Sequence, residues 1–187
     1  GYSVWASNVI YNETMKKYVM YFCTTSSYVK STLCFATADN IEGPYTYVDT
    51  ILYSGYGKSN ISETNLYDVL GKNADISRYL EYGGYNNKEW PNCIDPAIFT
   101  DADGRMWMNY GSWSGGIFLL EIDPATGYPI YPVDDKDADP YYGYRLIGGG
   151  HHSAEGPYIQ YDAENGYYYL FVSYGDLQSD GGYQIRQ

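Results

Sequence analysis

The sequence predicts an all-β protein made of small antiparallel sheets arranged as the blades of a β-propeller. Its composition favours strands and tight turns over helices: Tyr, Trp and Phe make up 19% of the 187 residues, Gly contributes 21, and charged residues only 18%. Strand-like runs recur with turn signals between them, in three groups spaced by roughly fifty residues. Three such meanders in succession are typical of propeller blades.

The first group contains four expected strands joined by short turns, at residues 4–11, 17–24, 31–37 and 45–53. Cys23 and Cys34 fall on successive strands, where they could face each other or remain two buried thiols. Because Cys93 is the third cysteine, at least one is unpaired within the chain. No C-x-x-C pair or Cys/His cluster indicates zinc.

The second and third groups follow an interruption. The second has expected strands at 97–100, 106–111, 116–122 and 144–147, and the third at 155–161, 167–174 and 183–186. Residues 101–104 (DADG) resemble the opening of a calcium loop, but no downstream Glu completes it, so we interpret them as a hairpin turn. Residues 58–90 break the strand pattern with short helical turns at 62–70 and 76–80. We interpret them as an insertion between blades, where binding loops often lie, and residues 134–142 as a second polar loop.

The charge excludes some partners. The formal net charge is −12 and the pI about 4.3, so the surface repels phosphate backbones and anionic lipids. We therefore expect neither nucleic acid nor a membrane as a partner, whereas a neutral polysaccharide is compatible with this surface. No apolar run approaches membrane-spanning length, and the chain opens with Gly-Tyr-Ser rather than with a signal peptide.

Two carboxylates stand in unusual settings. Asp95 precedes a proline at the start of a buried strand; it is either a functional group or the cap of a turn. Glu155 is followed by Gly156 and Pro157, which let a substrate approach the backbone and fix the direction of the side chain. A partly desolvated glutamate has a raised pKa and can act as a general acid, although a charged turn residue would give the same pattern.

Two further segments carry polar or aromatic side chains. Residues 110–117 place Trp113 between two expected strands, as a platform for a sugar ring or as part of an ordinary hairpin. His151 and His152 are adjacent, and neighbouring side chains usually point in different directions, so we expect a loop role for them rather than metal ligation. No metal-binding residues are predicted.

Several segments, in order along nearly the whole chain, are similar to motifs of glycoside hydrolase family 43, and especially of its endo-1,5-α-L-arabinanase branch. They are residues 4–9 (VWASNV), 36–39 (ATAD) with 42–45 (EGPY), 94–104 (IDPAIFTDADG), 110–113 (YGSW), 153–158 (SAEGPY), 167–173 (YYYLFVS) and 181–186 (GGYQIR). Only the insertion at 58–90 falls outside this set.

The resemblance implies a five-bladed β-propeller, of which this chain represents about three blades as one partial catalytic domain. Residues 1–57 would form blade two, 58–90 an inter-blade insertion, 91–147 blade three and 148–187 an incomplete blade four. Family members invert anomeric configuration, and Glu155 matches their general acid. Asp95 matches the aspartate that orients this acid and raises its pKa. The substrate-binding residues that we expect are Trp5, Asn92, Ser112, Trp113 and Ser153.

The chain also departs from the family pattern. The general base of the family is an aspartate upstream of the Trp-Ala segment, and no residue of this chain matches it. Residues 5–8 (WASN) replace the usual Trp-Ala-Pro-Asp, so we assign no role to Asn8. We therefore expect the chain to hydrolyse nothing unless another segment supplies the base. No cofactor is certain; the resemblance allows a central calcium ion whose histidine side lies in a fifth blade outside this chain.

The expected function is inverting cleavage of α-1,5-L-arabinofuranosyl linkages in plant cell-wall polysaccharide, arabinan or arabinoxylan. Such a polymer substrate implies a secreted or cell-surface protein. Two alternatives stay open: an exo-acting α-L-arabinofuranosidase or β-xylosidase of the same family, and a non-catalytic carbohydrate-binding propeller. The retained pair Asp95 and Glu155 argues against the non-catalytic alternative, because a binding module needs no perturbed acid.

Overall fold

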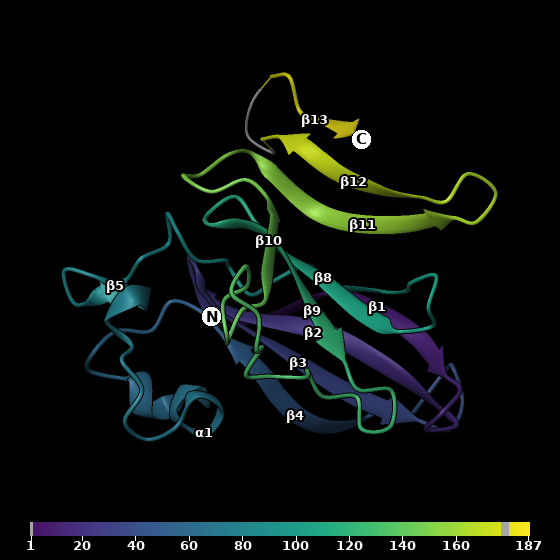
Figure 1. The fold of residues 1–187 in the computed structure, drawn as a ribbon, viewed down its shortest axis with the longest axis horizontal. Coiled ribbons are helices and arrows are strands. Elements are labelled where there is room, and N and C mark those ends of the chain that lie inside the picture. The colour runs from purple at the N-terminus through teal and green to yellow at the C-terminus, as the bar shows by residue number, and fades with distance from the viewer. Residues whose placement is uncertain (1, 177–179) are drawn as a thin grey trace.

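A computed structural model of the chain describes residues 2–176 and 180–187. They form three larger antiparallel sheets that follow one another along the chain (Figure 1), besides one small two-stranded sheet. The first sheet contains β1 (Ser3–Asn12), β2 (Lys17–Ser27), β3 (Lys30–Ala38) and β4 (Thr46–Tyr53). Neighbours in the sequence are neighbours in the sheet, as expected for a meander.

The second and third sheets repeat this plan. The second contains β7 (Ala97–Thr100), β8 (Met106–Ser112), β9 (Gly116–Ile122) and β10 (Tyr144–Ile147), and the third contains β11 (Ala154–Asp162), β12 (Tyr167–Gly175) and β13 (Tyr183–Arg186). The strands predicted from the sequence are confirmed, and the DADG turn joins β7 to β8 as a hairpin. In space, the first strand of the second sheet, β7, contacts both β1 and β11.

The strands form where apolar side chains alternate. In β2, Val19, Tyr21 and Cys23 are buried on one face, since successive side chains of a strand point to opposite faces. In β8 every residue is buried, because this sheet is covered on both sides. The second sheet is therefore the middle layer, as Figure 1 shows.

The cysteines do not pair. Cys23 lies opposite Leu33, and Cys34 lies opposite Phe22. Adjacent register positions present their side chains to opposite faces of the sheet, so Cys23 and Cys34 cannot face each other. All three cysteines are buried free thiols. Of the two possibilities that the sequence left open, a pair of facing cysteines is therefore wrong.

The insertion at 58–90 is a packed part of the core. It contains the short helix α1 (Leu66–Leu70), 3₁₀ turns at Ile61–Glu63 and Ser77–Tyr79, and a small hairpin of β5 (Leu80–Glu81) and β6 (Gly84–Tyr85). Leu66 and Tyr79 are fully buried in the main core cluster. The Tyr79 hydroxyl donates to both carboxylate oxygens of Asp139, at 3.1 Å each, and so joins the insertion to the second polar loop.

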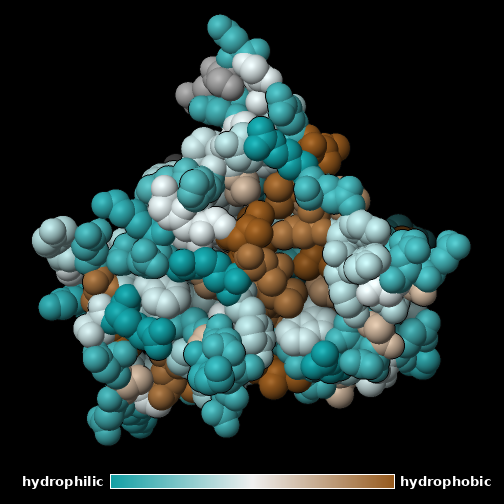
Figure 2. All heavy atoms as spheres, turned by 45° about the horizontal axis from the view of Figure 1, so that its top comes forward, coloured by the Kyte–Doolittle hydropathy of each residue, from teal (hydrophilic) through white to brown (hydrophobic). Residues whose placement is uncertain are grey.

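The interface between the second and third sheets is less filled. A gap of about 360 Å³ lies between them, lined mainly by apolar side chains that include Leu119, Ile147, Ile159 and Leu170. Figure 2 shows apolar side chains gathered in a hollow on this side of the molecule. No helix of the described residues has the length and apolar character that a membrane span requires.

Candidate active site

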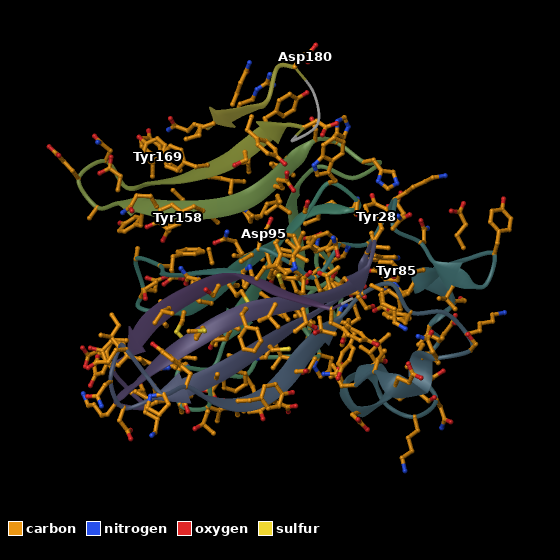
Figure 3. The ribbon with its side chains drawn as sticks, turned by 180° about the vertical axis from the view of Figure 1, so that it is seen from behind. Tyr28, Tyr85, Asp95, Tyr158, Tyr169 and Asp180 are labelled. Carbon is orange, nitrogen blue, oxygen red and sulfur yellow. The ribbon has the colours of Figure 1, made fainter. Side chains whose placement is uncertain are left out.

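A cleft of about 470 Å³ lies where strand ends and loops of the three sheets meet. Its lining residues come from all three sheets and their loops: Trp5, Thr25, Tyr28, Val29, Asn92, Ile94, Ser112, Trp113, Ser114, Glu155, Asp176 and Tyr183. Figure 3 places Asp95 near the middle of the molecule, between the third sheet and the other two, with Tyr28 to one side. The cleft therefore depends on the packing of sheets that are far apart in the sequence.

Glu155 stands at the start of β11, just before an irregularity in the pairing of β11 with β12. Gly156 has a φ of +58°, a conformation that a glycine adopts without strain. Both carboxylate oxygens of Glu155 accept hydrogen bonds. Ser112 Oγ donates to Oε2 at 3.0 Å, and the Tyr183 hydroxyl donates to Oε1.

Asp95 lies directly beside this carboxylate. Its Oδ2 accepts a hydrogen bond from the backbone N–H of Gly156 at 3.1 Å, which ties Asp95 to the residue after Glu155. The pKa of Asp95 is raised to about 6, mainly because the carboxyl group is buried; the hydrogen bond from Gly156 acts to lower it and the nearby Glu155 charge to raise it. Asp95 also has a φ of +55°, a left-handed conformation that is uncommon for a non-glycine residue. Such strain is often kept at functional sites.

Ser112 and Trp113 come from the end of β8 and the turn that follows it. Ser112 is 3% exposed, so its hydroxyl is held rigidly against Glu155. The Trp113 N–H donates to the Ala154 carbonyl at 2.9 Å and ties this turn to the third sheet. Gly115 keeps the turn close to the insertion: its N–H donates to the Trp90 carbonyl, and a Cβ at this position would lie 2.4 Å from the Trp90 carbonyl carbon.

The remaining predicted substrate-binding residues differ in position. Trp5 is 42% exposed, and its Nε1 donates to Thr25 Oγ1 at 3.0 Å on the wall of the cleft. Asn92 is 8% exposed and lines the same cleft. Ser153 is not among the lining residues; its carbonyl accepts a hydrogen bond from the Gly175 N–H. The structure therefore brings Trp5, Asn92, Ser112 and Trp113 to the cleft beside Glu155, but not Ser153.

Two tyrosines in the cleft were not predicted as site residues. Tyr183 belongs to the matched segment 181–186, but only the pairing of β13 with β12 brings it to Glu155. Tyr28 lies in the turn between β2 and β3, with its hydroxyl 3.5 Å from His151 Nδ1. Little in the sequence singled out these two residues as site residues, because tyrosine is abundant throughout the chain.

In the part of the chain that the structure describes, no group of three or more His, Cys, Asp or Glu side chains could hold a metal ion. The central calcium ion remains a prediction. His151 and His152 lie in the glycine-rich loop before β11, and the His151 N–H donates to the Ser114 carbonyl at 3.0 Å.

The geometry of the cleft suits acid catalysis. One carboxylate is held by hydroxyl donors on both oxygens, and a second carboxyl, whose pKa burial raises to about 6, accepts a hydrogen bond from the next backbone N–H. Aromatic side chains and buried polar groups surround the pair, as in sites that bind sugars. The arrangement can hold a polar substrate and place a proton donor against it.

The comparison with known families agrees with this chemistry. The family model described as "Glycosyl hydrolases family 43" matches residues 62–187. The chain belongs to glycosyl hydrolase family 43. The family assignment made from the sequence motifs is therefore confirmed, and the match includes Asp95, Ser112, Glu155 and Tyr183.

Within the family, the chain is similar in sequence to known arabinanases. The chain is 40% identical over 183 residues to an extracellular endo-α-(1→5)-L-arabinanase of Thermotoga petrophila, and 39% identical over 184 residues to a second such enzyme of Bacillus subtilis. Both matches cover 98% of this chain and 34% of the relative, so the chain spans about a third of these curated proteins.

Solved structures give the same result. A crystal structure of the Thermotoga petrophila endo-1,5-α-L-arabinanase superposes with a TM-score of 0.74, covering 98% of this chain and 36% of that one. A family 43 endo-arabinanase from Bacillus licheniformis superposes with a TM-score of 0.63 at 25% identity, covering 97% and 49%. The fold of this chain therefore matches part of the fold of each of these enzymes.

Proposed function

We propose that this chain is the central part of a glycosidase that cleaves α-1,5-L-arabinofuranosyl linkages in arabinan with inversion of configuration. The observation that carries the proposal is the carboxyl pair: Glu155 held between Ser112 and Tyr183, with Asp95 bonded to the next backbone N–H. The similarity to extracellular endo-arabinanases supports both the substrate and a secreted location.

In this mechanism Glu155 is the general acid. The proton on its carboxyl group passes to the glycosidic oxygen while the bond between that oxygen and the anomeric carbon breaks. A water molecule attacks the anomeric carbon from the opposite face and gives its proton to a carboxylate base. No residue of this chain matches the family's base, so we propose that another segment of the complete protein supplies it.

Asp95 supports the acid through the backbone. Its hydrogen bond to the Gly156 N–H fixes the backbone that carries Glu155. The two carboxyl groups also interact electrostatically, since the Glu155 charge contributes to the raised pKa of Asp95.

Trp5 and Trp113 give the cleft its affinity for sugar. Each presents an aromatic side chain to the cleft, and such rings pack against the apolar faces of sugar rings while hydroxyl groups meet polar neighbours. Asn92 and Ser112 supply buried polar groups in the same cleft. The net charge of −12 suits a neutral polymer such as arabinan.

The test is product analysis on linear 1,5-α-arabinan. It compares this chain, a longer protein that restores the segments present in its relatives, and that longer protein carrying Glu155→Gln. We expect oligosaccharides from the restored protein alone and a loss of at least about a hundredfold in the variant, the usual contribution of a general acid. Asp103→Asn, in the exposed β7–β8 turn, is the matched control and should keep full activity.

Each other result has a definite meaning. Release of arabinose alone would indicate the exo-acting activity, and α-configured rather than inverted products would contradict the proposed stereochemistry. No release from arabinan, xylan or aryl arabinosides by the restored protein would overturn the enzyme proposal. Sugar binding that survives Glu155→Gln without any hydrolysis would instead identify a carbohydrate-binding propeller.

A further inference from the structure

The two oxygens of Glu155 meet different kinds of donor. Ser112, which binds Oε2, is almost completely buried at the end of β8 in the second sheet. Tyr183, which binds Oε1, is 44% exposed on β13 at the edge of the third sheet. The terminal torsion of a glutamate is broad and roughly two-fold, so one donor alone leaves the carboxyl plane poorly defined. Donors on both oxygens fix the plane.

The register of the third sheet brings Tyr183 to this position. Glu155 on β11 lies opposite Ser173 on β12, and Ser173 lies opposite Ile185 on β13. Tyr183 is paired with Gly175, one step of two residues further along the same face. The β12 residue that pairs with Tyr183 is a glycine, so the strand between Glu155 and Tyr183 carries no side chain at this point.

Gly175 is required for the approach of β13. Its φ is +136°, and a Cβ there would lie 2.2 Å from the Gly182 carbonyl oxygen, a distance that backbone atoms cannot accommodate. A glycine at this position therefore lets the backbone before Tyr183 come close to β12. The same local geometry that joins these strands directs the tyrosine toward the acid.

We propose that Tyr183 is a positioning residue for Glu155, which its hydroxyl holds at Oε1 while Ser112 holds Oε2. The inference rests on the proposed function, since it assigns Tyr183 to the proton transfer that Glu155 performs. Because the donor to Oε2, Ser112, is buried and the donor to Oε1, Tyr183, is partly exposed, we assign Oε1 to the leaving group. Tyr183 orients this oxygen and stabilises the carboxylate that remains after the proton has left.

Other charged and titratable groups lie in or near the same cleft. Asp176, which follows β12, and Tyr28 line it, while Asp95, before β7, and His151 contact residues around it. Among them, Asp95 bonds the backbone of Gly156, and Tyr28 contacts His151; neither has a hydrogen bond to the Glu155 carboxylate. Tyr28 is therefore a matched control: it is a cleft tyrosine whose hydroxyl has a different partner.

The experiment compares Tyr183→Phe, Tyr28→Phe and the unchanged protein, all in the longer protein used above. Two substrates are tested: linear arabinan, whose leaving alcohol needs a proton, and an aryl α-1,5-arabinotrioside, whose leaving phenolate needs none. For Tyr183→Phe we expect roughly a tenfold loss of kcat on arabinan, a loss below about twofold on the aryl substrate, and little change in KM. Tyr28→Phe should affect both substrates equally.

A second measurement does not depend on activity. Crystal structures of the unchanged protein and of Tyr183→Phe should show the Glu155 carboxyl group turned away from Ser112 only in the variant. Equal kcat losses on both substrates, or an unmoved carboxyl group, would overturn the role of Tyr183. If the unchanged protein releases no sugar at all, the proposed function fails, and the crystal structures alone decide whether Tyr183 positions Glu155.

Discussion

The two interfaces between the three sheets differ in what holds them together. Between the first and second sheets, one large cluster of buried apolar side chains includes Tyr21 and Phe35 on one side and Met108 and Phe118 on the other. Between the second and third sheets, the buried cluster consists of Ile117, Ala154 and Val172, with Leu170 packed against it. The gap of about 360 Å³ lies beside this smaller cluster.

Polar links replace part of the missing apolar contact at the second interface. The Gly156 N–H donates to Asp95, the Trp113 N–H to the Ala154 carbonyl, and Ser112 Oγ to Glu155. Each of these bonds involves the candidate site or its direct neighbours. The candidate carboxyl pair is therefore positioned by hydrogen bonds across a lightly packed interface, while the larger core supplies the stability. Functional regions are often drawn from the less stable parts of a fold.

The largest expected loss of stability follows from a substitution in the core between the first and second sheets. Phe35 is fully buried and stacks on Tyr21 with ring centroids 5.7 Å apart. We expect Phe35→Ala to lower the free energy of unfolding by about 3–5 kcal/mol, because it leaves a large cavity. Val172→Ala, in the smaller cluster, should cost only about 1–2 kcal/mol. Urea unfolding of both variants measures the difference, and equal losses would contradict the comparison.

The next effect concerns the charge at the smaller interface, and its sign depends on pH. The pKa of Asp95 is raised in the folded state to about 6, from an ordinary value of 3.8. The folded protein therefore binds a proton more tightly than the unfolded chain, and stability is lost as the pH rises from about 4 through 6. Ionised Asp95 then costs the fold up to about 3 kcal/mol.

Asp95→Asn should remove this cost. Asparagine keeps an oxygen for the Gly156 N–H and tolerates the left-handed backbone at this position. We expect the variant to be more stable than the unchanged chain at pH 8 and equal to it below pH 4, as measured by urea unfolding at both values. A variant that is less stable at pH 8 would show that the carboxylate stabilises the interface.

The smallest effect concerns one polar link between the second and third sheets. The Ala102 N–H donates to the Tyr168 hydroxyl at 2.8 Å, while the Tyr168 ring packs near Phe99. Tyr168→Phe removes the hydroxyl and keeps the ring, so we expect a loss of about 0.5–1 kcal/mol in thermal or urea unfolding. Tyr167→Phe, exposed on the same strand, should stay within about 0.5 kcal/mol of the unchanged chain. Equal losses of stability in the two variants would show that the hydrogen bond between Ala102 and Tyr168 does not stabilise the fold.

Much of the fold was predictable because its elements are local. Alternating apolar residues and turn signals located the strands to within a few residues of their observed ends, and the DADG turn was correctly interpreted as a hairpin. The insertion at 58–90 was recognised as irregular, but its burial was not. Tyr79 reaches Asp139 across 60 residues of sequence, and no local pattern signals a contact of that kind.

The sequence by itself determined the all-β character, the order of the strands and the family, and it singled out Asp95 and Glu155 as candidate site residues, since these depend on short-range patterns and motifs. Only the tertiary structure decided that Cys23 and Cys34 lie on opposite faces, that Ser153 stays outside the cleft, and that Tyr183 reaches Glu155. These outcomes depend on strand register and on the packing of one sheet against another. Both are set by contacts between distant residues, where a shift of one residue exchanges the two faces of a strand.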